Sequence, residues 1–254
     1  MFFSLIDRVP PQSEGRILIA EYVRIRPQTE IPTFVNAAAE FYISSGLEGS
    51  GRYTLRCAGR AISGDLRTVA LLWEAQSGAT AVEVAQAARA KVDPEAIALV
   101  DGIDVKFMKP TSYDARRGDL SKGRRSNGSI NVFLTKDDRS YEPDGDIPCA
   151  LHDEIVLAKG GLENFREAAA DLLAAFETKT GWVFSGAGED LERPDRLMHF
   201  WRMVGIGTIP PAMTALSDIP EYAKIQDKIV TELQNLYMAA RRDLPIGSVK
   251  GDPA

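Results

Sequence analysis

Two stretches of the chain resemble each other and decide the fold: TFVNAAAEFY, residues 33–42, and NFREAAADLL, residues 164–173. When they are aligned, a phenylalanine, a run of three alanines and an acidic residue coincide, at Phe34 and Phe165, 37–39 and 168–170, and Glu40 and Asp171. A match of this kind predicts that one supersecondary unit is built twice.

The resemblance continues after these stretches. Each copy goes on to a glycine that opens a strand-like run, and then to a run that ends in tryptophan. The distance from Gly51 to Trp73 is 22 residues, and the distance from Gly181 to Trp201 is 20. Because the order and the spacing are both kept, we interpret the chain as an internal duplication.

The duplication divides the chain, whose 254 residues fit one or two domains by length alone. It predicts a first repeat over residues 1–113 and a second over 129–243, joined by a basic linker at 114–128 and followed by a tail at 244–254. The chain is long enough to bury a sizeable core without disulfides or metals.

Each repeat is expected to follow the order β-α-β-β-α, which is the ferredoxin-like split βαβ arrangement. Residues 17–26 alternate as a strand does, and apolar residues from Leu162 to Phe176 recur at helical spacing. In the second repeat, a D-x-x-E pattern at Asp218 and Glu221 predicts a final helix over residues 218–240. Its apolar stripe would consist of Tyr222, Ile225, Ile229, Leu233, Leu236 and Ala240.

The edges of the two predicted sheets differ. The first repeat ends in a strand-like run at residues 103–113, whereas the second shows no strand after its final helix. A short strand candidate at residues 129–135 is therefore predicted to fill the missing edge.

The composition narrows the class of protein. Hydrophobic residues make up 44% and charged residues 26% of the chain, which excludes a disordered or collagen-like protein. Thirty basic and 36 acidic residues give a net charge of −6, so the composition offers no attraction to nucleic acid. Cys57 and Cys149 form no CxxC motif, which argues against a disulfide framework or a cysteine zinc site. Without a signal peptide or an apolar run of about 18 residues, we expect a cytoplasmic protein with no membrane partner.

The strand, the Phe-containing helix, the Gly-led strand and the strand ending in LLW (Trp73) or HFW (Trp201) together resemble the dimeric α+β barrel superfamily, and its NIPSNAP-like branch in particular. The resemblance implies an α+β fold in which the antiparallel sheets of two ferredoxin-like repeats pack into a barrel, here within one chain. The superfamily includes cofactor-free monooxygenases, polyketide cyclases, lactone isomerases, haem-degrading enzymes, haem-dependent dehydratases and modules without known chemistry. The fold alone therefore does not select a reaction.

Both histidines lie in the second repeat and are candidate catalytic residues. His152 and Glu154 share the more polar face of a predicted strand and are expected to point into the barrel, about 6.5–7 Å apart. A carboxylate beside an imidazole can orient it as a general base. His199 is a second acid/base candidate whose direction is left open, and Leu71 takes its place in the first repeat. The simpler interpretation is that these are hydrogen-bonded structural residues.

Four further residues are predicted to contact a substrate. Tyr22 and Arg24 would point into the barrel and bind a developing oxyanion, although an arginine paired with a neighbouring acid fits equally well. Trp73 and Trp201 are either packing residues or walls for an aromatic ligand. The chain has no phosphate-binding loop, no GxSxG motif and no HExxH pair, so no metal site is predicted.

These residues support a leading hypothesis, a cofactor-independent cyclase, isomerase or monooxygenase that acts on a partly apolar, polyketide-like or aromatic molecule. A haem-dependent dehydratase or haem-binding enzyme, with haem on either histidine, is the alternative, and a non-catalytic ligand-binding module is the third hypothesis. The expected partners are a small-molecule substrate and, for some arrangements, a second copy in a homodimer. The linker carries a basic cluster that is either a solvated loop or a lid over an anionic ligand: Arg116, Arg117, Lys122, Arg124 and Arg125.

Overall fold

The computed structural model describes most of the chain, namely residues 2–11, 15–45, 52–61, 64–113, 149–158, 160–203, 206–225 and 229–239. The predicted linker, with its basic cluster, the strand candidate at 129–135 and the predicted tail all lie outside these residues. Domain boundaries in those regions stay predictions.

The first half of the described chain contains four strands and the helices between them. A short 3-10 helix, η1 (Phe2–Ile6), precedes them. The elements then follow in the order β1 (Ile17–Ile25), η2 (Gln28–Glu30), α1 (Ile31–Ser44), β2 (Tyr53–Ala61), β3 (Thr68–Ala75), α2 (Gly78–Lys91), α3 (Pro94–Ala98) and β4 (Val100–Pro110).

The second half has the same order of strands and main helices. Its elements are β5 (Cys149–Leu157), α5 (Gly161–Thr180), β6 (Val183–Asp190), β7 (Arg196–Met203), η6 (Ile206–Thr208), α6 (Ile209–Ser217), α7 (Pro220–Ala223) and β8 (Ile229–Ala239). The strand–helix–strand–strand–helix–strand order predicts two four-stranded antiparallel sheets.

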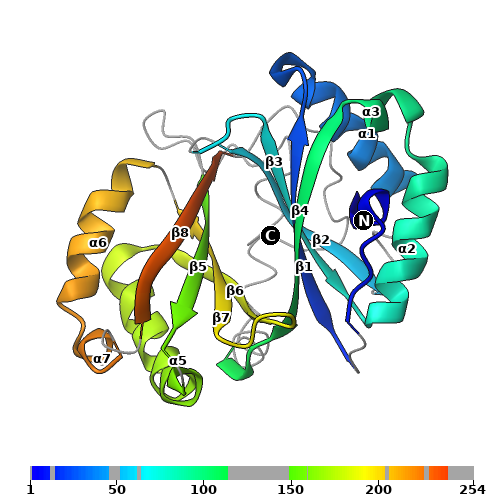
Figure 1. Cartoon of the computed structure of the whole chain (residues 1–254). Helices are drawn as coiled ribbons and strands as arrows, with labels where there is room; N and C mark the ends of the chain where they lie inside the picture. Colours follow the sequence, from blue (N-terminus) through cyan, green and yellow to red (C-terminus); the bar gives the residue numbers. More distant parts are fainter. Residues whose placement is uncertain are drawn as a thin grey trace, which may run out of the picture.

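The described strands close into one antiparallel barrel, in the order β1-β3-β2-β8-β5-β7-β6-β4 (Figure 1). Within each half the ladders are long, whereas backbone pairing between the described strands of the two halves is confined to the C-terminal ends of those strands. One junction pairs Arg60 with Ala239 on β2 and β8, and the other pairs Met108 with Asp190 on β4 and β6. The barrel therefore consists of two sheets that meet along two short seams.

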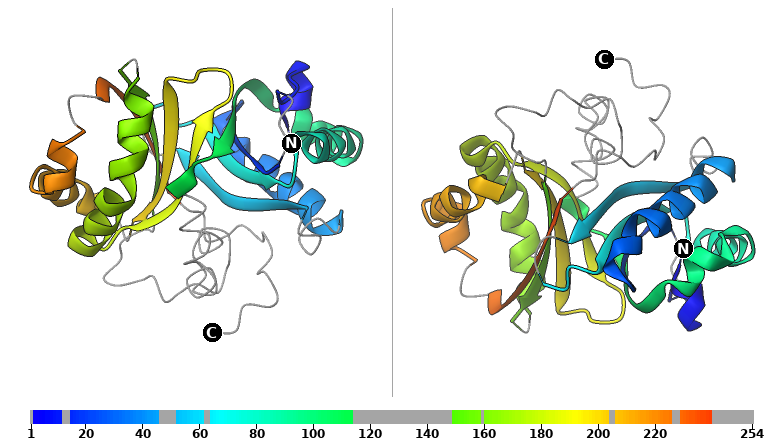
Figure 2. Two further views of the ribbon diagram at one scale, coloured as in Figure 1. Left: turned by 90° about the horizontal axis from the view of Figure 1, so that it is seen from below. Right: turned by 90° about the horizontal axis from the view of Figure 1, so that it is seen from above.

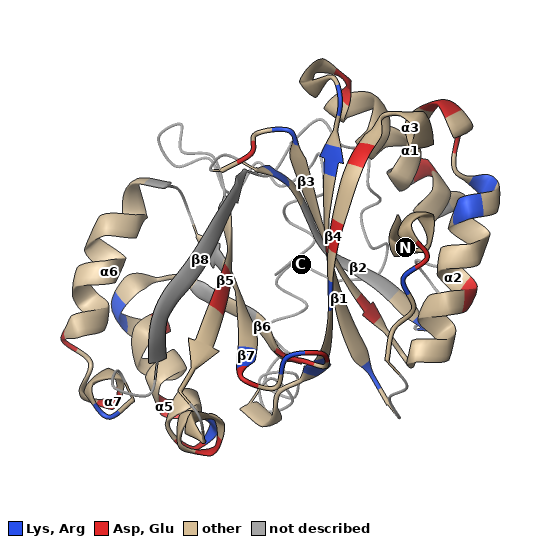
Figure 3. Ribbon diagram, in the orientation of Figure 1, with Lys and Arg blue, Asp and Glu red and all other residues tan. Residues whose placement is uncertain are grey.

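Helices cover the outer face of each sheet. Helices α1, α2 and α3 lie against the sheet of the first half, and α5, α6 and α7 against that of the second (Figures 1 and 2). Two hydrophobic clusters fill these layers, one around Trp73 and Phe34 and the other around Trp201 and Phe165. Lys, Arg, Asp and Glu are found mainly at strand ends, on loops and on the outer sides of helices (Figure 3). An acidic segment, drawn red, lies within β5.

The predicted final helix over residues 218–240 is wrong. Residues 229–239 form β8, which pairs along β5 from Cys149 opposite Ala239 to Leu157 opposite Ile229. The second helix of this half is instead α6, which has prolines in its first turn and ends where Asp218 caps it. Without β8, the edge of β5 would be left unpaired, and pairing of this kind overrides a helical apolar spacing. The missing edge strand therefore comes from residues that sequence periodicity assigned to a helix.

None of the helices in the described part of the chain is long and apolar enough to cross a membrane.

Candidate functional site

Alternate residues of β5 face two different environments. Leu151, Asp153 and Ile155 point toward the covering helices, where they line a pocket. His152 and Glu154 point to the opposite side of the sheet, toward the other half. The side chain of His152 contacts Tyr22 on β1, and that of Glu154 contacts Lys106 on β4. This strand could therefore contribute to a site on either face.

Inside the barrel, the hydroxyl group of Tyr22 lies 3.0 Å from Nδ1 of His152. The ring of Phe200 stands edge-on to the imidazole, at 4.8 Å between centroids. His152 is 1% exposed, and its Nε2 has no hydrogen-bond partner among the described residues. Burial lowers the pKa of His152 to about 3. The ring is therefore neutral near pH 7 and a weak base.

Glu154 does not orient His152. Its Oε1 lies 2.8 Å from Nζ of Lys106 and 3.0 Å from Nη1 of Arg196. Burial raises the pKa of Glu154, but the hydrogen bonds from Lys106 and Arg196 outweigh it, and the net shift is downward. Glu154 is thus a buried anion held between two cations.

The structure does not bring Arg24 and Trp73 to the same place as Tyr22 and His152. Arg24 is half exposed at the end of β1, where its Nε lies 3.4 Å from Asp101. Trp73 is fully buried in the first half, and its Nε1 donates a hydrogen bond of 2.8 Å to Glu21. Arg24 therefore has the simpler of its two expected roles, pairing with a neighbouring acid, and Trp73 is a packing residue.

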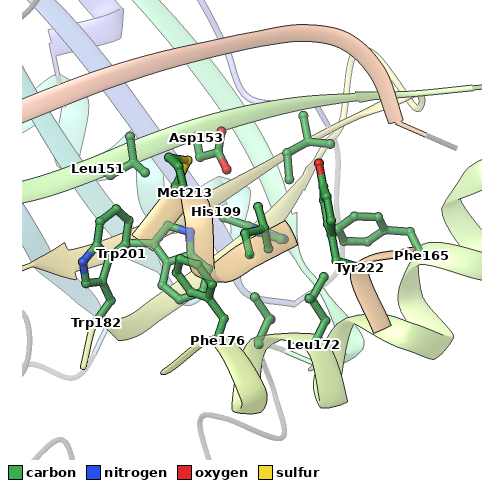
Figure 4. Close-up of a pocket in the computed structure, with 13 residues that line it drawn as sticks. Leu151, Asp153, Phe165, Leu172, Phe176, Trp182, His199, Trp201, Met213 and Tyr222 are labelled. Atoms are coloured by element: carbon green, nitrogen blue, oxygen red, sulfur yellow. The ribbon is translucent and has the colours of Figure 1, made fainter. Parts of the chain in front are cut away.

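A cavity of about 80 Å³ lies between the sheet of the second half and α5, α6 and α7 (Figure 4). Its walls are almost entirely apolar and aromatic: Leu151, Ile155, Phe165, Leu172, Leu173, Phe176, Trp182, Trp201, Met213, Leu216 and Tyr222. Two titratable residues, Asp153 and His199, complete the lining. Met213 is 38% exposed, so the cavity reaches the surface beside α6. Largely apolar pockets with a few polar groups are the usual form of small-molecule sites.

Asp153 and His199 are direct cross-strand partners on β5 and β7. Side chains at such positions have Cβ atoms about 4.5–5.5 Å apart on one face of the sheet. Asp153 as a whole is partly exposed, but its Oδ1 is buried and has no hydrogen-bond partner among the described residues. Burial raises the pKa of Asp153 to about 7. This carboxyl group can therefore both accept and donate a proton near neutral pH.

His199 is held on the wall of this cavity. Its Nε2 lies 2.9 Å from the hydroxyl group of Tyr113, and the rings of Phe165 and Phe184 pack against it. Burial lowers the pKa of His199 to about 3. It is therefore a neutral, oriented hydrogen-bonding group rather than a charged one.

Sequence reasoning placed His199 and Trp201 among the site candidates, and both line the cavity. It missed Asp153. The available signal was an acidic residue at the centre of the apolar face of β5, between Leu151 and Ile155, where strand alternation predicts burial. An acid in such a position needs either a partner or a function.

The cavity does not fit a haem group. An enclosed space of about 150 Å³ holds one benzene ring, and the roughly 80 Å³ found here is smaller than that. Among the described residues, no group of three or more His, Cys, Asp or Glu side chains is arranged to hold a metal ion.

The fold and the site together define an α+β barrel with one half carrying an apolar, acid-containing pocket. Two proteins named as putative monooxygenases, from Lactobacillus acidophilus and Fusobacterium nucleatum, have this fold, each with a TM-score of 0.59, 10% identity and coverage of 89% of this chain and 93% of theirs. A variant of chlorite dismutase from Candidatus Nitrospira defluvii is also similar, with a TM-score of 0.52, 11% identity and coverage of 92% and 94%. No family model and no curated protein matches the sequence. At this level of identity the likeness shows the fold and not the reaction.

Proposed function

We propose that the chain is an enzyme that transfers a proton on a small, partly apolar organic molecule, bound without a cofactor in the cavity between β5, β7 and α5. The observation that carries this proposal is Asp153, which lines an apolar cavity opposite His199 and whose buried Oδ1 has no partner among the described residues. A buried carboxyl group with a pKa shifted toward neutrality is typical of catalytic acids and bases.

Each residue has a distinct role in this reaction. Asp153 accepts a proton from an activated C–H or O–H group of the substrate and returns one later in the cycle. His199, neutral at this pH and fixed by Tyr113, offers a hydrogen bond to the oxygen on which negative charge develops. The aromatic walls, including Trp201 and Phe165, favour a substrate with an aromatic ring.

The three reaction types of the leading hypothesis, those of a cyclase, an isomerase and a monooxygenase, begin with the same removal of a proton and differ in their later steps. A panel of phenols, hydroquinones and β-diketones, incubated with and without oxygen, tests them. Oxygen consumption indicates a monooxygenase, whereas a rearranged product formed under nitrogen indicates an isomerase or cyclase. Binding without any turnover would favour a ligand-binding module instead.

The assignment of the base is tested within a single strand, because His152 and Asp153 are neighbours on opposite faces of β5. The proposal predicts that Asp153→Asn lowers kcat by about 10²–10⁴-fold. If His152 were the base instead, His152→Ala would cause a loss of that size. If His152→Ala lowers kcat more than Asp153→Asn does, the catalytic base is His152 and the active site lies in the barrel interior.

The absence of a cofactor is tested by absorption. The purified protein should show no Soret band between 300 and 700 nm, and added haem should have the same Soret band with the protein as without it. A Soret band that shifts in the presence of the protein would favour the haem-dependent alternative over the cofactor-independent enzyme.

We also propose that the two halves arose by duplication of a ferredoxin-like unit related to NIPSNAP-like domains. The shared order of elements and the matched tryptophans support this origin, since Ile19 pairs with Trp73 as Leu151 pairs with Trp201.

A further inference from the structure

The two halves have an acidic residue at the same place. Glu21 is the cross-strand partner of Leu71 and lies two residues beyond the partner of Trp73. Asp153 is the partner of His199 and lies two residues beyond the partner of Trp201. Both acids are the fifth residue of a nine-residue strand. Both lie on the side of the sheet that carries the helices, Glu21 bonded to Phe3 of η1 and Asp153 in the cavity lined by α5. Glu21 and Asp153 therefore correspond.

In the first half, this position is filled by the chain itself. The backbone N–H of Phe3 donates a hydrogen bond of 2.7 Å to Glu21, whose second oxygen accepts the one from Trp73. The ring of Phe2 packs against Phe34 at 4.9 Å between centroids. Helix η1, which carries both phenylalanines, lies between α2 and β4 beside the N marker in Figure 1.

In the second half, the corresponding place is the cavity. Phe165, which aligns with Phe34, lines it, as do Trp201 and Asp153. No described segment there supplies what Phe2 and Phe3 supply in the first half, and Asp153 Oδ1 has no partner among the described residues.

We propose that the cavity binds an aromatic molecule bearing an O–H or N–H donor, with the ring against Phe165 and the donor on Asp153, in the way that Phe2 and Phe3 occupy the first half. This inference rests on the proposed use of the cavity as a ligand site and specifies the chemical class of its ligand. The cavity as it stands, about 80 Å³, is smaller than the space that holds a benzene ring, so binding an aryl ring requires the long, flexible side chain of Met213, 38% exposed at the mouth, to move aside.

A matched pair of probes tests the inference on the full chain. Phenol and anisole share a ring, but methylation removes the donor from anisole. Calorimetric titration at pH 8, where Asp153 is largely ionised, should give a Kd for phenol about 10- to 100-fold lower than that for anisole. Equal affinities, or no measurable binding of phenol, would overturn the proposal.

Substitutions then test whether the preference for phenol over anisole depends on Asp153. In Asp153→Val the ratio of the two affinities should fall below about threefold, and Asp153→Asn, which keeps an acceptor, should lie between this and the unaltered protein. Asp195→Asn, at an exposed position between β6 and β7, is the matched control and should keep the full ratio. A preference that survives Asp153→Val would also overturn the proposal.

Binding and turnover are separate readouts. If phenol binds selectively but Asp153→Asn leaves turnover unchanged, the proposed catalytic role fails and the ligand class stands. If Asp153→Asn abolishes turnover of some substrate while phenol and anisole bind alike, the ligand class fails and the catalytic role stands.

Discussion

The hydroxyl group of Tyr22 on β1 and Nδ1 of His152 on β5 lie 3.0 Å apart, so a hydrogen bond connects the two halves of the barrel through its interior. Strands β1 and β5 are not neighbours in the order of the barrel. The contact therefore adds a link between the two sheets at a distance from the seams, where the backbones pair.

Removing this link should destabilise the fold. In Tyr22→Phe, His152 would keep both ring nitrogens buried without the tyrosine hydroxyl, which costs about 1–3 kcal/mol of unfolding free energy. Urea denaturation measures the loss. Tyr222→Phe, at a partly exposed position, is the control and should change stability by less than about 0.5 kcal/mol. Equal effects of the two substitutions would show that the hydrogen bond contributes nothing.

Acid should unfold the protein through its two histidines. The pKa values of His152 and His199, about 3, lie below the value of 6.5 for the unfolded chain. Between these limits the unfolded state binds more protons, so stability falls as pH falls from 6.5 toward 3, by up to about 1.4 kcal/mol per pH unit for each group. Unfolding free energies measured at several pH values below 7 test this slope. His152→Asn should make it shallower, and an unchanged slope would contradict burial of a neutral imidazole.

Asp153 should have the opposite effect. Its pKa of about 7 lies above the unfolded value of 3.8, so the folded state binds the extra proton and stability falls as pH rises from 3.8 to 7. Asp153→Asn removes this loss. Its stability relative to the unaltered protein should therefore increase by roughly 1–3 kcal/mol between pH 4 and pH 8. Thermal unfolding of both proteins at the two pH values is the measurement, and a pH-independent difference would be inconsistent with a buried, uncharged carboxyl group.

The corresponding tryptophans should differ in what they stabilise. Trp73→Phe removes the indole donor from the buried carboxylate of Glu21, in addition to reducing packing. Trp201→Phe makes the same change in side-chain volume, at a residue that lines the cavity. We expect Trp73→Phe to cost about 1–3 kcal/mol more than Trp201→Phe in chemical denaturation. If the two cost the same, the hydrogen bond to Glu21 is energetically neutral.

Local patterns predicted most of the elements because the strands and helices here have clear periodicities. The segment ending in Trp73 and the helix containing Phe165 are examples, and both are found at the expected places. Residues 229–239 could not be assigned in this way. Their apolar spacing fits a helix, and the strand they form depends on the unpaired edge of β5, which is a property of the assembled sheet.

The site was harder to predict than the fold for a similar reason. The alternation of β5 correctly separates His152 from Leu151, but it does not show which face carries the apolar cavity. That depends on how α5, α6 and α7 cover the sheet. The orientation of Glu154 toward Lys106 depends on a strand from the other half of the chain, and no spacing within β5 could reveal it.

The short seams between the two sheets have a consequence for each half on its own. In the barrel, β2 and β4 pair with β8 and β6 only near their ends, at Ala61 and Pro110. A half of the chain produced alone would present both strands as open edges with unsatisfied backbone groups, which are ready templates for another chain. Such a fragment should assemble with a second copy of itself. We expect the covalent connection between the halves to take the place of such self-association. It also lets the two halves differ: the place filled by Phe2 and Phe3 in one corresponds to the cavity lined by Asp153 in the other.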